Sequence, residues 1–226
     1  MGRKASKFYP IMLDVAGKPC LVVGGGQVAE RKTLGLLDAD AAVRLVSPDL
    51  TPRLMQLAED GVVQVRQGEY RIEDMNDARL VIAATSDQET NERIARDAAA
   101  RGIPANVADR SDGGDFITPS VVRRGDLVLT VSLSGASPSL AAKIAAELSD
   151  RYGESYEDYA LWLRRLRELA LQDVADIAVR KRVLRAALEV EEAEWRSDTD
   201  EDKLRARLRG LTADGGETGI AGENGG

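Results

Sequence analysis

The fold is decided by the stretch Leu21-Val22-Val23-Gly24-Gly25-Gly26-Gln27-Val28-Ala29. A short apolar run ends in three glycines and leads into a helical pattern, which predicts a strand, a tight turn and a helix. Gly24 permits the turn, and Gly26 lets a phosphate group approach the backbone. Ala29 stands where a third glycine is common, and its small side chain allows the helix to pack closely on the strand.

Amide groups at the start of this helix would lie at its positive end, where anions bind. We therefore expect Gly25, Gln27 and Val28 to hold the phosphates of a dinucleotide together with the two glycines named above. A turn with a purely structural role is the alternative. The strand and helix on either side of the glycines favour nucleotide binding.

Strand and helix signals alternate around this stretch over the first hundred residues. Strands are predicted at residues 19–23, 42–46, 62–65, 80–84 and 104–107, and helices at 28–39, 51–60 and 89–101. Short units of this kind predict a parallel sheet with right-handed crossovers. Because the strands are continuously apolar, we expect both faces of the sheet to be buried.

The pattern changes after Asp109. Strands are predicted at residues 116–122 and 127–133, and a helix at 140–152 that is capped by Ser137 with Pro138 in its first turn. Residues 156–195 are helical in pattern almost throughout. The polar and glycine-rich residues from 197 onward predict a disordered tail.

Polar residues follow the second and fourth strands at the carboxyl edge of the predicted sheet. Ser47, Pro48 and Asp49 come about 20 residues after the glycines, where a carboxylate would accept the ribose 2′-hydroxyl. Capping of the next helix is an equal alternative for Asp49. Arg53 is the only nearby arginine, so NAD is expected rather than NADP. Thr85 and Ser86 either line the cofactor or cap the helix that follows them.

The fifth strand ends in Asn106-Val107-Ala108-Asp109-Arg110. Ligands of open α/β sheets bind at this edge, so Asn106 and Asp109 are expected near the nicotinamide. The chain contains no histidine, and Asp109 is the best candidate for an acid or base. An ion pair of Asp109 with Arg110, or a turn cap, is the alternative.

Residues 132–139 form a hydroxyl-rich loop that leads into a helix start, which favours an anion. Ser134 and Ser137 are candidate substrate contacts in this loop. The candidate basic contacts close to it in sequence are Arg110, Arg123, Arg124 and Lys143. Together they suggest a cradle for a substrate with carboxylates, whereas a capped loop with solvated surface charges is the alternative.

Composition narrows the possible functions. A net charge of −7 argues against a nucleic-acid partner. No apolar run is long enough to span a bilayer. The single cysteine, Cys20, lies in an apolar run, where we expect a buried side chain in a protein of a reducing compartment. These features favour a cytoplasmic protein, and without histidine we expect no metal site.

Five motifs in order resemble the precorrin-2 dehydrogenase family, which includes the N-terminal part of siroheme synthases. They are Gly24-Gly25-Gly26-Gln27-Val28-Ala29-Glu30-Arg31-Lys32, Ala83-Ala84-Thr85-Ser86-Asp87, Asn106-Val107-Ala108-Asp109, Phe116-Ile117-Thr118-Pro119-Ser120 and Ser134-Gly135-Ala136-Ser137-Pro138. The resemblance runs from about Phe8 to Leu148. Where some relatives have a Ser-Ser-Gly-Gly loop, this chain has Ser132-Leu133-Ser134-Gly135.

The resemblance implies NAD-dependent oxidation of precorrin-2 to sirohydrochlorin by a homodimer. The family's important aspartate falls on Asp109, and its NAD contacts fall on Gln27, Val28, Pro48 and Asp49. Some members also insert ferrous iron, and we rank dehydrogenation alone above this bifunctional alternative because the chain lacks histidine. Two further alternatives are an NAD-sensing module without turnover and a helical dimer scaffold.

These inferences divide the chain into four parts. We expect a Rossmann-type NAD-binding domain at residues 1–115, a dimerisation segment at 116–152, a helical C-terminal domain at 153–196 and a disordered tail at 197–226.

Overall fold

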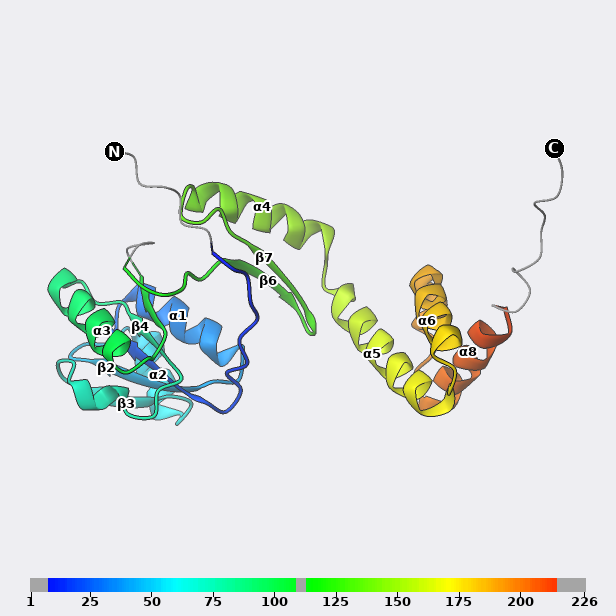
Figure 1. Cartoon of the computed structure of the whole chain (residues 1–226), viewed down its shortest axis with the longest axis horizontal. Coiled ribbons are helices and arrows are strands. Elements are labelled where there is room, and N and C mark those ends of the chain that lie inside the picture. The colour runs from blue at the N-terminus through cyan, green and yellow to red at the C-terminus, as the bar shows by residue number, and fades with distance from the viewer. Residues whose placement is uncertain (1–7, 109–112, 215–226) are drawn as a thin grey trace. The chain divides into compact units, whose positions relative to one another are not determined.

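A computed structural model describes residues 8–108 and 113–214 of the 226-residue chain. The chain forms two compact units (Figure 1). The first comprises the residues up to 119 together with 132–140, and the second comprises residues 120–131 together with those from 141 onward.

The first unit contains a five-stranded parallel sheet. Its strands are β1 (Pro19–Val23), β2 (Ala42–Ser47), β3 (Gln64–Gln67), β4 (Leu80–Ala83) and β5 (Ala105–Val107). Their order in the sheet is β3-β2-β1-β4-β5. The chain therefore adds β2 and β3 on one side of β1 and then returns to add β4 and β5 on the other side. The order reverses between β1 and β4, which is the switch point where open α/β sheets bind ligands.

Helices cover both faces of this sheet. They are α1 (Gln27–Leu37), α2 (Pro52–Glu59), the 3₁₀ turn η1 (Ile72–Met75) and α3 (Gln88–Ala100). Cys20 and Val22 of β1 pack in one core cluster with residues of α1 and α2. Leu21 and Val23 pack in a second cluster with residues of η1 and α3. The alternation of β1 side chains between two cores explains why its sequence is apolar without a break.

The second unit joins a hairpin to a group of helices. The hairpin pairs β6 (Ser120–Arg124) with β7 (Leu127–Val131) in antiparallel fashion. The remaining elements are α4 (Pro138–Arg151, whose first residues belong to the first unit), α5 (Ser155–Asp173), α6 (Ile177–Ala186), η2 (Ala187–Glu189), α7 (Glu192–Trp195) and α8 (Glu201–Asp214). Trp162, Leu166 and Trp195 are buried in the core of these helices. None of the helices in the described ranges has the length and apolar character that crossing a bilayer requires.

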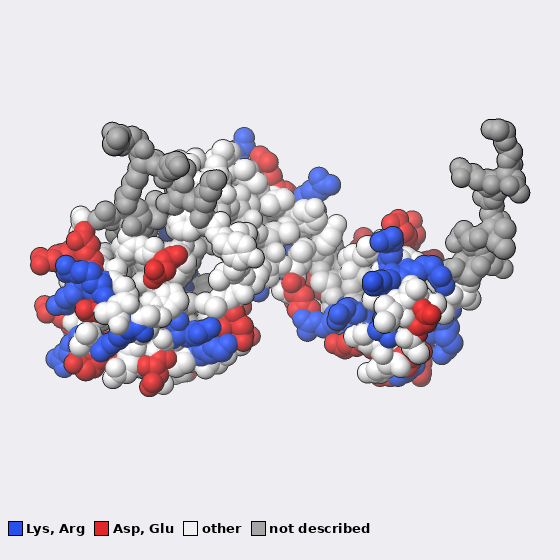
Figure 2. Space-filling model, in the orientation of Figure 1, with Lys and Arg blue, Asp and Glu red and all other residues white. Residues whose placement is uncertain are grey.

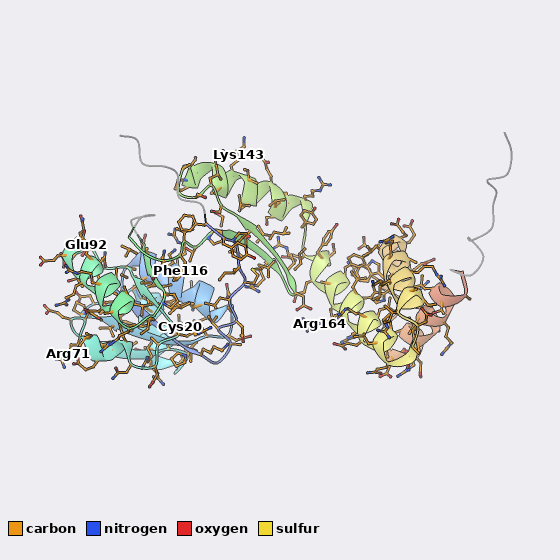
Figure 3. The ribbon with its side chains drawn as sticks, viewed as in Figure 1. Cys20, Arg71, Glu92, Phe116, Lys143 and Arg164 are labelled. Carbon is orange, nitrogen blue, oxygen red and sulfur yellow. The ribbon has the colours of Figure 1, made fainter. Side chains whose placement is uncertain are left out.

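The predicted fold class is confirmed. The sheet is parallel and covered on both faces, and helices dominate the C-terminal part. The strand predicted from residue 116 begins only at Ser120. Residues 116–119 belong to the first unit instead. The Asn106 side-chain amide donates to the Phe116 carbonyl at 2.9 Å, and the Phe116 side chain (Figure 3) packs on the core of that unit.

The prediction of a disordered tail from residue 197 is wrong for residues 201–214, which form α8. Leu204 and Leu208 are buried in the helical core although most of their neighbours are charged or exposed. Two leucines four residues apart on one helix face are enough to attach α8 to that core. Residues 215–226 lie outside the described residues.

Leu208→Ala should lower the free energy of unfolding of the helical core by about 2–4 kcal/mol, because it removes a buried side chain and leaves a cavity. Arg209→Ala, at the next and exposed position, should change it by less than about 0.5 kcal/mol. Urea denaturation followed by Trp fluorescence measures both. Equal and negligible effects of the two substitutions would mean that α8 does not pack as described.

Candidate functional site

The glycine turn lies at the carboxyl edge of the sheet, where β1, β2 and β4 end at the same level. Val23 pairs with Val46 of β2 on one side and with Ala83 of β4 on the other. The Gly24 amide donates to the Val46 carbonyl at 2.9 Å, and the Ala84 amide donates to the Val23 carbonyl at 2.8 Å. The three loops that follow these strands therefore start side by side at the switch point.

Gly24 and Gly25 are glycines because the protein's own backbone leaves no space for a side chain. Gly24 has a φ of +123°, and a Cβ there would lie 2.3 Å from the Ala84 carbonyl oxygen. A Cβ on Gly25 would lie 1.9 Å from the carbonyl oxygen of Asp49. Both contacts are with backbone, so no side-chain movement relieves them.

Gly26 is different, because none of the described residues requires a glycine there. Its φ of −82° is open to any residue, and no heavy atom of residues 8–108 or 113–214 lies within 4 Å of a Cβ built on it. Gly26 is the N-cap of α1 and provides no side-chain hydrogen bond to the first amides of the helix. The open approach and the unpaired amides form a cradle for a negatively charged group at the positive end of α1.

The loop after β2 is fixed to this turn. Thr51 donates its backbone amide to the Gly25 carbonyl at 2.9 Å and its hydroxyl to Glu30 of α1 at 2.5 Å. Thr51 also caps α2, because its hydroxyl accepts from the Leu54 amide. The helix cap that sequence reasoning left open for Asp49 therefore belongs to Thr51.

Asp49 is exposed beside the glycine turn. Its carboxylate has no hydrogen-bond or ion-pair partner among the described residues. The buried Ser47 holds this loop in shape by donating its hydroxyl to the Asp49 carbonyl at 2.7 Å, and the exposed Pro48 lies between them. Ser47 thus positions the loop, whereas Asp49 is accessible to a ligand.

The loop after β4 is held by Asn91 of α3. Thr85 donates its amide and its hydroxyl to the Asn91 side-chain oxygen, at 3.1 and 2.8 Å. Asp87 caps α3 by accepting from the Thr90 amide at 2.9 Å, so neither Thr85 nor Ser86 is the cap. Ser86 is exposed at the edge of the sheet.

Hydrogen bonds of Asn106 and Asp115 hold the chain together at the end of β5. Asn106 is buried, and its side-chain amide donates to the Phe116 carbonyl. Among the described residues its side-chain oxygen has no hydrogen-bond partner. The Asp115 carboxylate accepts from the Ala105 amide at 3.0 Å, and the Asp115 amide donates to the Ala105 carbonyl at 2.8 Å. The predicted base Asp109 and its neighbour Arg110 lie outside the described residues.

The sequence analysis did not identify the role of Asp115. The signal was Gly114, where a Cβ would lie 2.4 Å from the Ala105 carbonyl oxygen. A glycine directly before an aspartate fits a backbone that must lie against a strand end and be tied to it.

An open hollow of about 610 Å³ lies between α3 and the ends of β4 and β5. Its lining includes Ser86 from the loop after β4, Asn91 and Glu92 of α3, Val107 at the end of β5, and Gly113; Glu92 is labelled on α3 in Figure 3. The hollow lies on the side of the switch point away from β2, where a Rossmann-type fold places the second half of a dinucleotide.

The hydroxyl-rich loop has the predicted helix cap. Ser137 accepts from the Leu140 amide at 3.2 Å, and α4 begins at Pro138. Ser134 is exposed and has a φ of +54°, and its amide donates to the Ser132 hydroxyl at 3.1 Å. Ser134 and Ser137 both belong to the first unit.

The predicted substrate cations with described positions all belong to the second unit. Arg123 is exposed. Arg124 is engaged in the scaffold, since its guanidinium donates to the Ser149 hydroxyl of α4 at 2.8 Å. Lys143 is mostly exposed, with the Glu147 carboxylate 3.9 Å away. Their contacts with substrate remain predictions.

Charge is mixed over the face of the molecule that Figure 2 shows. Lys and Arg side chains lie among Asp and Glu on each unit, and no single basic field dominates this face. Within residues 8–108 and 113–214, no group of three or more His, Cys, Asp and Glu side chains could hold a metal ion.

Comparison with known proteins is consistent with this geometry. A family model of NAD(P)-binding domains matches residues 11–120. Siroheme synthase of Chromobacterium violaceum is 36% identical over 210 residues, which are 93% of this chain and 45% of that protein. Siroheme synthase of Nitrosococcus oceani is 34% identical over 208 residues, 90% of this chain and 44% of that protein. The chain thus spans about half the length of these curated relatives.

A solved structure is also similar over most of the chain. It is that of SirC, a precorrin-2 dehydrogenase, with a TM-score of 0.69 and 28% sequence identity. The match covers 91% of this chain and all of SirC.

The three glycines should respond differently to alanine. Gly24→Ala and Gly25→Ala should each lower the free energy of unfolding by about 2 kcal/mol or more, because the new Cβ meets backbone atoms. Gly26→Ala should change it by less than about 1 kcal/mol, because the space beside it is open. Chemical denaturation of the three variants measures this. Equal destabilisation by all three would contradict the geometry of the turn.

Proposed function

We propose that the chain belongs to the precorrin-2 dehydrogenase family, which includes the N-terminal part of siroheme synthases, and that it oxidises precorrin-2 to sirohydrochlorin with NAD. The reaction removes two hydrogens from the tetrapyrrole, one as a hydride and one as a proton. The products are then sirohydrochlorin, NADH and a proton. Bound NAD supplies the hydride acceptor, so the protein has to position both molecules and take up the proton.

The observation that carries this proposal is the open cradle at Gly26. A dinucleotide's pyrophosphate would fit there because the N-cap residue gives the first amides of α1 no side-chain hydrogen bond, and no described side chain blocks the approach to them. Gln27 and Val28 would provide these amides.

Asp49 favours NAD over its 2′-phosphorylated form. Its exposed carboxylate stands beside the glycine turn without a partner among the described residues, at the end of β2. A carboxylate there accepts hydrogen bonds from a ribose 2′-hydroxyl and repels a 2′-phosphate.

The other half of the cofactor would lie toward β4 and β5. Ser86, which follows Thr85, borders the hollow beside α3. Asn106 has a buried side-chain oxygen without a hydrogen-bond partner among the described residues. A hydrogen-bond donor at that oxygen would relieve the cost of burying it unpaired. A carboxamide such as that of nicotinamide carries such a donor.

Asp109 is the proposed proton acceptor. It follows Ala108, whose amide donates to the Ala83 carbonyl at 2.9 Å, so the chain leads into Asp109 from the end of β5. With no histidine in the chain, a carboxylate is the side chain best suited to this step. Ser134, Ser137 and the cations Arg110, Arg123, Arg124 and Lys143 remain the proposed contacts for the carboxylates of the substrate.

Anaerobic mixing of the protein with precorrin-2 and NAD should produce NADH, which is measured by its absorbance. Asp109→Asn keeps the shape of the side chain and removes its basicity, so kcat should fall by about 100-fold or more. The affinity for NAD should stay within about twofold, because the dinucleotide is held at the other strands.

Asp38→Asn is the matched control, since Asp38 is an exposed carboxylate at the far end of α1. It should leave kcat unchanged. If the unsubstituted protein formed no NADH at saturating precorrin-2, the proposal that it catalyses this oxidation would be excluded.

We also propose that the protein is a cytoplasmic homodimer that associates through its hairpin. No third strand of the described chain pairs with β6 or β7, and Val121 is 51% exposed. Val122 is the only residue of the two strands that is buried within the described chain. An isolated hairpin with exposed apolar side chains is only marginally stable, so a second copy would complete its packing.

Val121→Lys should shift the protein from dimer to monomer in light scattering coupled to gel filtration, because a charge would enter the apolar contact. Val62→Lys is the control, because Val62 is equally exposed in the first unit, at 49%. It should leave the mass unchanged. A monomeric mass for the unsubstituted protein would refute the homodimer.

A further inference from the structure

Lys32 is a half-buried cation that the proposed reaction does not yet use. It lies on α1, and its ammonium donates to the hydroxyl of Thr118. No carboxylate of the described residues lies within ion-pairing distance of it. Other basic side chains of the same unit do have a carboxylate partner, such as Lys18 with Asp14 and Arg66 with Asp74.

The surroundings of Lys32 disfavour its charge. Burial lowers the pKa of the ammonium, and the neighbouring charge of Arg31 lowers it further. A hydroxyl is a neutral partner, so it satisfies one donor of the ammonium without compensating the charge. An anion at this position would compensate the charge of the ammonium. It would favour the charged form of Lys32 and accept hydrogen bonds from its remaining N–H groups.

Lys32 is also close to the proposed cofactor cradle. It follows Val28 by four residues, which is about 6 Å along the helix axis, and lies on the same face of α1. Its partner Thr118 is exposed, so the pair is open to solvent. Thr118 belongs to the segment that Asn106 ties to the end of β5 through Phe116. The pair therefore connects α1, whose first residues form the cradle, with the segment attached to the end of β5, the strand that precedes Asp109 in the sequence.

We propose that Lys32 and Thr118 form a subsite for one carboxylate of the tetrapyrrole substrate. The inference rests on the proposed function and adds two residues to its substrate site. A carboxylate is favoured over a phosphate of the cofactor, because the amides at the start of α1 already serve the phosphates. Lys32 would give the ion pair, and the Thr118 hydroxyl would donate a hydrogen bond to the same group.

The test measures binding of sirohydrochlorin and of NAD separately, together with turnover, in the full chain. Lys32→Met keeps the length of the side chain and removes its charge. We expect the Kd for sirohydrochlorin and the KM for precorrin-2 to rise about tenfold. The Kd for NAD and the kcat at saturating substrate should stay within about twofold. Thr118→Val should show a smaller change in the same direction.

Arg31→Met is the matched control, since it removes the same charge from the next and exposed position of α1. It should leave all four quantities within twofold. Lys32→Arg should restore most of the tetrapyrrole affinity, which a purely structural clip between α1 and residue 118 does not require.

Two results would overturn the subsite. One is unchanged tetrapyrrole affinity in Lys32→Met, and the other is a loss confined to NAD. If the unsubstituted protein bound NAD but neither bound sirohydrochlorin nor oxidised precorrin-2, the proposed function itself would fail. Turnover by the unsubstituted protein with no effect of Lys32→Met would instead reject the subsite alone.

Discussion

Close approach of backbone to backbone at Gly24 and Gly25 is the constraint on which the rest of the site depends. A Cβ on Gly24 would lie 2.3 Å from the Ala84 carbonyl oxygen, and one on Gly25 would lie 1.9 Å from the carbonyl oxygen of Asp49. The loops after β1, β2 and β4 therefore pack together with backbone directly against backbone at these two glycines. This packing aims α1 so that its first amides face open space at Gly26. Gly24 and Gly25 are thus required by the fold, whereas Gly26 leaves space for the ligand.

The other loops of the edge are held by polar contacts that leave selected groups accessible. Thr51 ties the loop after β2 to the glycine turn and to α1, so that Asp49 beside it stays exposed. At β5, Asp115 holds the returning chain against Ala105. The loop after β2 thus has one residue that fixes it, Thr51, and one that a ligand can reach, Asp49. A binding site of this kind is preorganised, because the loop is already ordered before the ligand binds.

The glycine turn and the parallel sheet were predictable because they depend on local sequence: apolar runs, glycines and helix periodicity. The cap of α2 was not, since Asp49 and Thr51 are both good capping residues and only the backbone geometry separates them. Helix α8 was not predicted because its sequence is mostly charged. Its two buried leucines pack on helices that are distant in sequence. The division of the predicted substrate residues between two units is likewise a tertiary property. The lack of a carboxylate near Lys32 among the described residues also depends on segments far apart in sequence.

The most direct test of the central claim is the affinity of Gly26→Val for NAD, measured by calorimetry beside its free energy of unfolding. Gly35→Val is the control, because Gly35 is another exposed glycine of α1 with open space around it. If phosphates rest against the backbone at Gly26, its substitution should weaken NAD binding at least about tenfold, while the loss of stability stays within about 1 kcal/mol. Gly35→Val should leave the affinity unchanged. Unaltered NAD affinity in Gly26→Val would contradict the account.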